Sequence, residues 1–237
     1  LNFGYDAEKT ESLLIDKWNH YRTNNPDKKS LLLAQRWQDV TQLNDKVRSI
    51  LQAEGKVDSK EFSIKCSVSG KAFINKFAIG ERIRLTKNDY TKNLSNGDLG
   101  NIIDIQAQID GSYDFKVKLD NANKVTINSD EYCNDDGHLY MTQAYAMTVY
   151  SSQGLTIDGD AFVYYTSSMD RANTYVASSR QKDNCHLFIN NKEIQEINNV
   201  SSIDSLAKSM SVDNKKSLAI EYVEQSKEKV KQYVIGQ

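Results

Sequence analysis

The stretch that decides the fold reads TVYSSQGLT at residues 148–156 and DRANTYVASSR at residues 170–180, with the apolar run AFVYY at 161–165 between them. This pattern predicts a strand that ends at Val149, a polar turn, a strand over 160–165 and a helix over 169–181. The run at 185–189 predicts one more strand. Strands that alternate with helices are typical of a parallel sheet covered by helices.

The first 60 residues show the same alternation. Apolar residues recur at helical spacing over 7–22 and predict an amphipathic helix. The run LLLA within 30–35 predicts a buried strand. A second helix is expected to begin at Asp39 and to end near Gly55, which suits a C-terminal cap. Residues 1–59 and the stretch from residue 142 to 190 therefore predict one α/β fold built on a parallel sheet.

Between residues 60 and 141 the pattern changes to short segments separated by turns rich in Asn, Asp and Gly. The expected strands are Glu61–Cys66, Lys76–Leu85, Leu99–Gln106, Tyr113–Leu119 and Lys124–Ile127. Several short strands at close spacing are typical of a small antiparallel barrel. We therefore expect four parts: 1–59 and 142–190 of the α/β domain, a β-barrel module inserted at 60–141, and a helical tail at 191–237. The helices expected in this tail are Ile203–Met210 and Ser217–Val234.

The formal charge of −2 over 237 residues gives no overall signature of nucleic-acid binding. The local charge of the middle region is uneven. Eight Lys/Arg stand against three Asp/Glu in Lys60–Lys92, and three Lys stand against nine Asp/Glu in Asn93–Tyr140. The basic part also carries Phe73, Phe77 and Tyr90, which can stack on unpaired bases. The alternative is a solvated polar surface over a barrel core.

Cysteine and histidine usage favours a cytoplasmic chain without a metal site. Cys66, Cys133 and Cys185 are widely spaced and form no C-x-x-C pair, which indicates free thiols in a reducing cytosol. The three histidines are too scattered to suggest metal ligation. No apolar run approaches membrane-spanning length, so no membrane partner is expected. Because the chain begins at Leu1 rather than Met, we expect a fragment or a processed product.

Arg180 is the first candidate site residue. It falls near the end of the expected 169–181 helix, which Ser167 and Asp170 would begin as a capping box. A planar guanidinium there suits phosphate oxygens in a cleft. The alternative is that Arg180 neutralises the carboxyl end of its own helix. Arg171 lies early in the same helix, where a cation is disfavoured, so a salt bridge or a ligand role is expected for it.

The polar turn is the second candidate site. Ser151, Ser152 and the backbone amides near Gly154 can bind phosphate oxygens. Gln153 offers both a donor and an acceptor. The alternative is an ordinary strand-to-helix turn. The chain lacks a G-x-x-x-x-G-K-[ST] phosphate loop, since the Gly-Lys pair at 70–71 is followed by alanine and lacks the upstream glycine, so it has no loop to cradle a triphosphate.

Taken together, these residues resemble the second motor lobe of superfamily 1 DNA helicases. The similarity is greatest to the helicase region of TraA/MobA-type conjugative relaxase–helicases and more distant to RecD-type helicases. Residues 144–156 resemble motif V, usually close to T-x-H-K-[SA]-Q-G, and 175–180 resemble motif VI, usually close to Y-V-A-x-S-R. Residues 31–48 resemble the segment that opens the second RecA-like domain. Residues 80–83 and 96–100 resemble the small barrel inserted in that class.

The resemblance implies a role for each candidate on the nucleotide side. Arg180 matches the motif VI arginine that reaches the γ-phosphate. Gln153 and Gly154 match the motif V core, which couples the nucleotide state to the DNA strand. Arg171 is placed with this ATP-coupling group.

Four residues are expected on the DNA side, namely Thr148, Tyr150, Ser151 and Ser152. Thr148 and Ser152 match positions near the phosphates of single-stranded DNA. The family commonly has His at the position of Tyr150. At the position of Ser151 it commonly has Lys or a small residue. The loss of a lysine here weakens a charged contact with phosphate.

The resemblance also implies a RecA-like fold with an inserted SH3-like barrel and a motor made of two lobes. ATP and Mg²⁺ would bind in the full-length parent, and neither would be bound by this fragment alone. The expected partners are single-stranded DNA, a missing N-terminal helicase lobe and, where one is attached, a relaxase domain. The first hypothesis is a helicase-lobe fragment of a conjugative relaxase/helicase. The second is a degenerate helicase-fold module that binds single-stranded DNA or a protein without ATPase activity, and a third is an unrelated α/β scaffold with a β insert.

Overall fold

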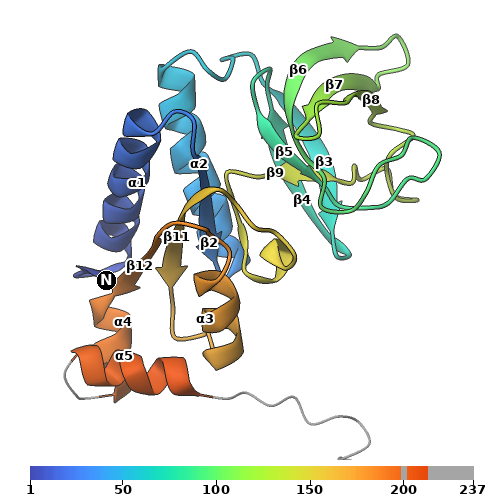
Figure 1. Cartoon of the computed structure of the whole chain (residues 1–237). Coiled ribbons are helices and arrows are strands. Elements are labelled where there is room, and N and C mark those ends of the chain that lie inside the picture. The colour runs from blue at the N-terminus through green and yellow to red at the C-terminus, as the bar shows by residue number, and fades with distance from the viewer. Residues whose placement is uncertain (199–201, 213–237) are drawn as a thin grey trace, which may run out of the picture.

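The computed structural model of the chain describes residues 1–198 and 202–212. The expected helix over Ser217–Val234 lies outside the described residues. One parallel sheet and two antiparallel sheets, of five and two strands, organise the described residues (Figure 1). The two ends of the described chain form the parallel sheet, and the middle forms the antiparallel ones. We call these the parallel half and the antiparallel half.

The parallel sheet has the strand order β1-β12-β11-β2-β10, and every pairing within it is parallel. Its strands are β1 (Asn2–Gly4), β2 (Lys29–Ala34), β10 (Ala146–Thr148), β11 (Gly159–Tyr165) and β12 (Cys185–Asn190). All residues of the central strand β11 are buried. Such continuous burial is expected of a parallel strand that is covered on both faces. The mixed α/β fold with a parallel sheet is therefore confirmed.

Helices cover both faces of the parallel sheet (Figure 1). They are α1 (Ala7–Asn24), α2 (Trp37–Ala53), α3 (Arg171–Ser178), α4 (Asn191–Asn198) and α5 (Ser202–Ser211). Because strand side chains alternate between faces, Leu32 of β2 joins a core with α1 and α2, including Leu43. The adjacent Leu33 joins the opposite core with Ala177 of α3.

The antiparallel half contains a five-stranded sheet of order β8-β7-β6-β5-β9 and a hairpin of β3 and β4. Its strands are β3 (Phe62–Val68), β4 (Lys71–Phe77), β5 (Arg82–Leu85), β6 (Leu99–Ala107), β7 (Tyr113–Leu119), β8 (Lys124–Asn128) and β9 (Met141–Gln143). Hairpin and sheet share one core, in which Cys66, Phe77 and Phe115 are fully buried. The backbone N–H of Ser67 also donates to the carbonyl of Leu139 at 2.9 Å, which ties β3 to the segment before β9.

A buried ion pair joins the two halves through α2. Nε of Arg48 lies 2.9 Å from Oε2 of Glu81, and its Nη1 lies 2.8 Å from Oε2 of Glu61. Arg48 and Glu81 are both buried. Burial raises the pKa of the Glu81 carboxyl, and the Arg48 guanidinium acts against that shift. The antiparallel half is thus fixed to α2 by charge as well as by packing.

Two of the expected strands are divided in the structure. Segment 76–85 holds the end of β4, a turn and β5, because Gly80 takes a φ of +90° that breaks the extended run. Segment 143–149 is divided between β9 of one sheet and β10 of the other. Asn44 stabilises this second break, since its Oδ1 accepts the backbone N–H groups of Tyr145 at 3.0 Å and Ala146 at 2.8 Å.

The helix expected over 169–181 is shorter, and its start differs from the prediction. Asp170 alone caps α3, with its carboxylate accepting the N–H of Asn173 at 2.8 Å. Ser167 instead donates its hydroxyl to Glu193 at 2.8 Å, so the predicted capping box is wrong. Helix α4 follows β12 directly and was not predicted from the sequence, whereas the short helix expected over 203–210 is present as α5.

Candidate nucleotide and DNA interface

The polar turn after β10 is a short 3₁₀ turn, η1 (Tyr150–Ser152). Oγ1 of Thr148 accepts the N–H of Ser151 at 3.0 Å and donates to Oγ of Ser151 at 2.9 Å. The hydroxyl of Ser152 donates to the carbonyl of Val149 at 2.7 Å and is fully buried. The hydroxyl groups predicted to face DNA therefore hold the turn in shape.

The first residue of η1 and the two residues after it are the exposed part of this segment. Tyr150 is 74% exposed, and Gln153 and Gly154 are also exposed. Gly154 has a φ of +82°, and a Cβ added there would meet nothing within 4 Å. Position 154 thus requires glycine because of its backbone conformation and not because of a lack of space for a side chain. The turn exposes the ring of Tyr150 and the side-chain amide of Gln153 to solvent.

Arg180 lies two residues beyond the end of α3 and is bound to its surroundings by three hydrogen bonds. Nε donates to the carbonyl of Val176 at 2.8 Å, Nη1 to the carbonyl of Leu155 at 3.3 Å and Nη2 to Oγ of Ser179 at 2.9 Å. The first bond neutralises the carboxyl end of α3. Among residues 1–198 and 202–212, no carboxylate forms an ion pair with this guanidinium. Arg180 is therefore held by neutral acceptors only.

The two stretches that carry the sequence motifs are joined by backbone hydrogen bonds. The N–H of Ile157 donates to the carbonyl of Arg180 at 2.9 Å, and the N–H of Lys182 donates to the carbonyl of Ile157 at 3.0 Å. Since Ile157 precedes β11 and Leu155 follows η1, this contact connects the polar turn to the end of α3. Arg180 is therefore in direct contact with Leu155 and Ile157, on the carboxyl side of the polar turn.

The structure does not bring all predicted site residues to one place. Arg171 begins α3 and Arg180 follows its end, so the two α-carbons are separated by about 13 Å at 1.5 Å per residue. Thr148 pairs with Ala34 at the carboxyl edge of the sheet, where η1 begins. Arg180 lies beside residues that precede β11, at the amino edge. Arg171 follows β11 at the carboxyl edge, so Arg180 is separated from both Arg171 and the predicted DNA residues, and segment 153–157 joins the two edges.

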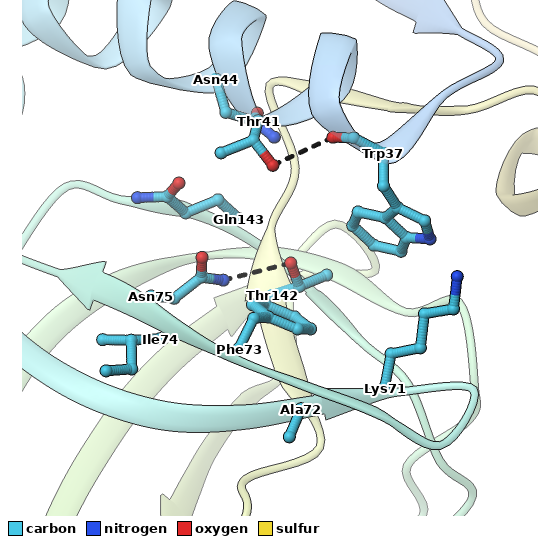
Figure 2. A pocket seen from close by; sticks show the side chains of 10 residues that line it. All are labelled: Trp37, Thr41, Asn44, Lys71, Ala72, Phe73, Ile74, Asn75, Thr142 and Gln143. Atoms are coloured by element: carbon cyan, nitrogen blue, oxygen red, sulfur yellow. Dashed lines mark hydrogen bonds between the residues drawn. The ribbon is translucent and has the colours of Figure 1, made fainter.

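A pocket that the sequence analysis missed lies between α2 and the antiparallel half (Figure 2). It has a volume of about 220 Å³ and is lined by Trp37, Thr41, Asn44, Lys71, Ala72, Phe73, Ile74, Asn75, Thr142 and Gln143. We call it the Trp37 pocket. The rings of Trp37 and Phe73 contact each other, with centroids 5.8 Å apart. Phe73 was predicted as a stacking residue, but its neighbours come from three distant segments, so no local pattern indicates the pocket.

A second hollow lies at the carboxyl edge of β2 and has the opposite charge character. Its volume is about 460 Å³, and it is lined in part by Glu8, Glu11 and Asp39. Arg36 is drawn into this acidic group, since its Nε lies 2.8 Å from Oδ2 of Asp39. The Asp39 carboxylate accordingly raises the pKa of Arg36. Lys46 also lines the hollow and pairs with Glu11, so both of its cations are engaged by carboxylates and the hollow is a poor match for phosphate.

No group of three or more His, Cys, Asp or Glu side chains within the described residues is arranged to hold a metal ion. None of the helices described combines the length and the apolar character needed to cross a bilayer.

Curated relatives of the chain are conjugal transfer proteins. The probable conjugal transfer protein TraA of Sinorhizobium fredii is 30% identical over 187 residues, which cover 77% of this chain and 15% of that protein. The conjugal transfer protein TraA of Rhizobium radiobacter is 30% identical over 182 residues, again with 77% and 15% coverage. The chain thus spans about 15% of the length of the curated relatives that it matches. No protein-family model matches it.

Solved structures with a similar fold are Pif1 helicases. The Pif1 helicase from Bacteroides in complex with ADP-AlF3 and single-stranded DNA gives a TM-score of 0.53 at 17% identity, over 84% of this chain and 46% of that one. Bacteroides Pif1 bound to single-stranded DNA gives a TM-score of 0.50 at 18% identity, with the same coverage. At these identities the likeness shows the fold alone.

Proposed function

The chain is homologous to part of the TraA conjugal transfer proteins and shares the fold of a Pif1 helicase lobe, and from this premise we propose that it is the second motor lobe of a conjugative relaxase/helicase. In this proposal the intact protein translocates along DNA and unwinds it at the expense of ATP. The observation that carries the proposal is the joint between the two motif stretches, in which Arg180 binds Leu155 and Ile157.

Arg180 is proposed as the catalytic arginine of the motor. Its guanidinium is bound to two carbonyls and a hydroxyl, and each can be exchanged for a phosphate oxygen without breaking an ion pair within the described residues. ATP bound between this lobe and a first lobe would supply the γ-phosphate, with Mg²⁺ held by the first lobe. The Nη1 bond to Leu155, at 3.3 Å the longest of the three, is the contact that Arg180 would give up first.

Coupling to DNA is proposed to follow when the Arg180 guanidinium releases the carbonyl of Leu155. Leu155 follows directly on Gly154 and Gln153, so a change at its carbonyl alters the exposed part of the turn. Thr148, Ser151 and Ser152 keep η1 rigid, and Tyr150 offers a ring to the strand. Arg171, at the other end of α3, is proposed to contribute to the lobe contact rather than to touch the same phosphate.

The antiparallel half is proposed to be an SH3-like barrel inserted at residues 60–141, with the α/β lobe formed by 1–59 and 142–190 and a helical tail after it. Support comes from the single core and from the bonds between β3 and Leu139, which begin to close the sheet. Single-stranded DNA is the proposed partner, since the Pif1 structures of this fold contain it. An N-terminal lobe and a relaxase domain are proposed for the remaining length of the parent, and the cytoplasm for its location.

A second candidate function is a degenerate lobe that binds DNA or a protein without supporting hydrolysis. The hydrogen bonds that occupy Thr148, Ser151 and Arg180 favour it, because all three polar side chains already have partners within the chain. The two proposals differ in whether Arg180 changes partners during turnover.

Turnover of ATP by the intact parent, stimulated by single-stranded DNA, separates the two proposals. We expect Arg180→Ala to lower kcat by a factor of about 10³ or more while nucleotide affinity changes far less. Lys182→Ala is the matched control, since it removes a cation two residues away that is exposed and forms no ion pair among the described residues. Wild-type turnover in the Arg180→Ala protein would remove Arg180 from the mechanism.

A further inference from the structure

The Trp37 pocket has the composition of a site for one planar aromatic group. Trp37 and Phe73 form a continuous apolar surface, with their ring planes tilted by 38°. A base cannot insert between rings whose centroids are 5.8 Å apart, because two stacked layers need about 7 Å. It can stack against the open face of either ring. The volume of about 220 Å³ is below the roughly 300–1,000 Å³ of pockets that enclose a whole ligand.

Polar atoms at the pocket wall are available to a ligand. Nδ2 of Asn75 donates to Oγ1 of Thr142 at 3.1 Å, and Nε2 of Gln143 donates to the carbonyl of Lys76 at 2.8 Å. The carbonyl oxygens of these two amides accept no hydrogen bond from the described part of the chain. Figure 2 shows both amides on the same wall, beside Phe73. Two free acceptors next to a stacking surface match N–H donors at the edge of a base, such as the imino N–H of thymine.

Charge at the pocket favours a nucleic-acid strand over other aromatic ligands. None of the residues lining the pocket is acidic. The Lys71 ammonium forms no ion pair among residues 1–198 and 202–212, and Figure 2 shows it on the same side as the indole N–H of Trp37. Two donors at one lip suit the phosphate that follows a bound base. The acidic hollow at the other side of α2 lacks this character.

The pocket lies at the edge of the sheet where η1 begins. Ala34 pairs with Thr148, and its carbonyl accepts the N–H of Val149 at 3.0 Å. Trp37 comes three residues after Ala34, as Ser151 comes three residues after Thr148. Both η1 and the first turn of α2 therefore lie at the carboxyl edge of the parallel sheet.

We propose that the Trp37 pocket binds one unpaired base of single-stranded DNA, stacked on Trp37 and Phe73, with the adjoining phosphate at Lys71. The proposal rests on the proposed function and names a contact beyond the motif residues. One wall comes from α2 and the other from β4 and β9. A bound base therefore joins the two halves and makes the inserted module part of the grip on the strand.

The test uses the full 237-residue chain, which contains two tryptophans. Trp18 is buried and donates to Ser30, so Trp18→Phe leaves Trp37 as the single fluorescent reporter. A labelled dT 12-mer is titrated at low salt, with anisotropy reporting binding and Trp37 emission reporting stacking. An abasic 12-mer with the same phosphates is the matched ligand. We expect quenching by dT only, and affinity for the abasic strand weaker by about 5- to 140-fold.

Two further variants distinguish the loss of base stacking from a loss of folded structure. Phe73→Leu keeps apolar volume in the core and removes the ring, and it should weaken dT binding by a similar factor without changing the melting temperature by more than a few degrees. Ile109→Ala removes an apolar side chain that is fully exposed elsewhere in the antiparallel half, and it should leave affinity unchanged. Binding of dT without Trp37 quenching, or equal binding of the abasic strand, overturns the pocket and leaves DNA binding intact. No anisotropy change at all overturns the pocket together with DNA binding, whereas the ATPase role of Arg180 is judged by its own assay.

Discussion

The two halves of the molecule bury their strands in different ways. In the parallel half all seven residues of β11 are buried, because helices cover both faces of the sheet. In the antiparallel half β4 alternates between exposed and partly buried residues over most of its length. The partly buried face of β4 carries Phe73 and Asn75, which line the Trp37 pocket, and the exposed face carries Ala72, Ile74 and Lys76. The parallel half provides a rigid frame, and the antiparallel half provides side chains at its surface.

Helix α2 belongs to both halves. Leu43 and Val47 pack on the parallel sheet, while Arg48 holds Glu81 at the start of the antiparallel sheet. The same helix places Trp37 against Phe73. We therefore expect the halves to unfold together, although their cores are separate.

The largest expected loss of stability comes from breaking the buried ion pair of Arg48 and Glu81. Arg48→Ala leaves the buried Glu81 carboxylate without its cation, and the free energy of unfolding should fall by about 3–5 kcal/mol. Urea unfolding at pH 7 measures the loss. In the control Arg48→Met with Glu81→Met, both charges are replaced by apolar groups, and the loss should be much smaller. An equal loss in both proteins would mean that packing, not charge, joins the halves.

Two probes show whether the halves separate. Emission of Trp18 reports the parallel half once Trp37, whose ring contacts Phe73 of the antiparallel half, is replaced by phenylalanine. Reactivity of Cys66 reports the antiparallel half once Cys133 and Cys185 are replaced by serine. Burial raises the pKa of the Cys66 thiol to about 12, so it should react only after unfolding. Coincident transitions are expected in the wild type, and separate transitions would show two independent units.

Local patterns were sufficient where one element followed its own periodicity. Helix α1 and strand β7 match the expected ranges closely, because each has a regular apolar face and polar ends. The fold class followed from the alternation of such elements. Patterns failed where an apolar run passes through two elements, as in segments 76–85 and 143–149. There the break is made by a glycine φ and by a side chain of α2, and neither is visible in apolar spacing.

The candidate site was predictable only in part. The motif stretches were found from sequence, and the structure joins them at Leu155 and Arg180. Their internal hydrogen bonds were not predictable, because Thr148 and Ser151 can face either the chain or a ligand. The Trp37 pocket needs residues 37, 73 and 143 side by side, and only the packing of α2 on the antiparallel half brings them together.

A smaller effect is expected at the polar turn of the parallel half. Thr148→Val keeps the shape of the side chain and removes the hydroxyl that binds both groups of Ser151. The free energy of unfolding should fall by about 1 kcal/mol, the usual contribution of such bonds. Thr148→Ser retains the hydroxyl and should lose less. If urea unfolding gives the same loss for both, the methyl group rather than the hydrogen bonds stabilises the turn.

The smallest effect concerns the ion pair of Arg22 with Glu54 at the end of α2, which lies within the parallel half and whose carboxylate is exposed. The Arg22 guanidinium and then the Lys56 ammonium lower the pKa of Glu54 to about 2. A carboxyl whose pKa is lower in the folded state stabilises that state above its unfolded pKa of 4.5, and the contribution is lost as the pH falls toward 2.

Glu54→Gln should therefore cost less than about 1 kcal/mol at pH 7, because solvent screens this pair. The cost should decrease at pH 3.5 and also at pH 7 in 1 M salt, as measured by urea unfolding of both proteins under each condition. The buried pair at Arg48 should respond far less to salt, since water does not reach it. A cost at Glu54 that is independent of pH and salt would assign its effect to the C-terminal cap of α2, and charge would then matter only where α2 meets the antiparallel half.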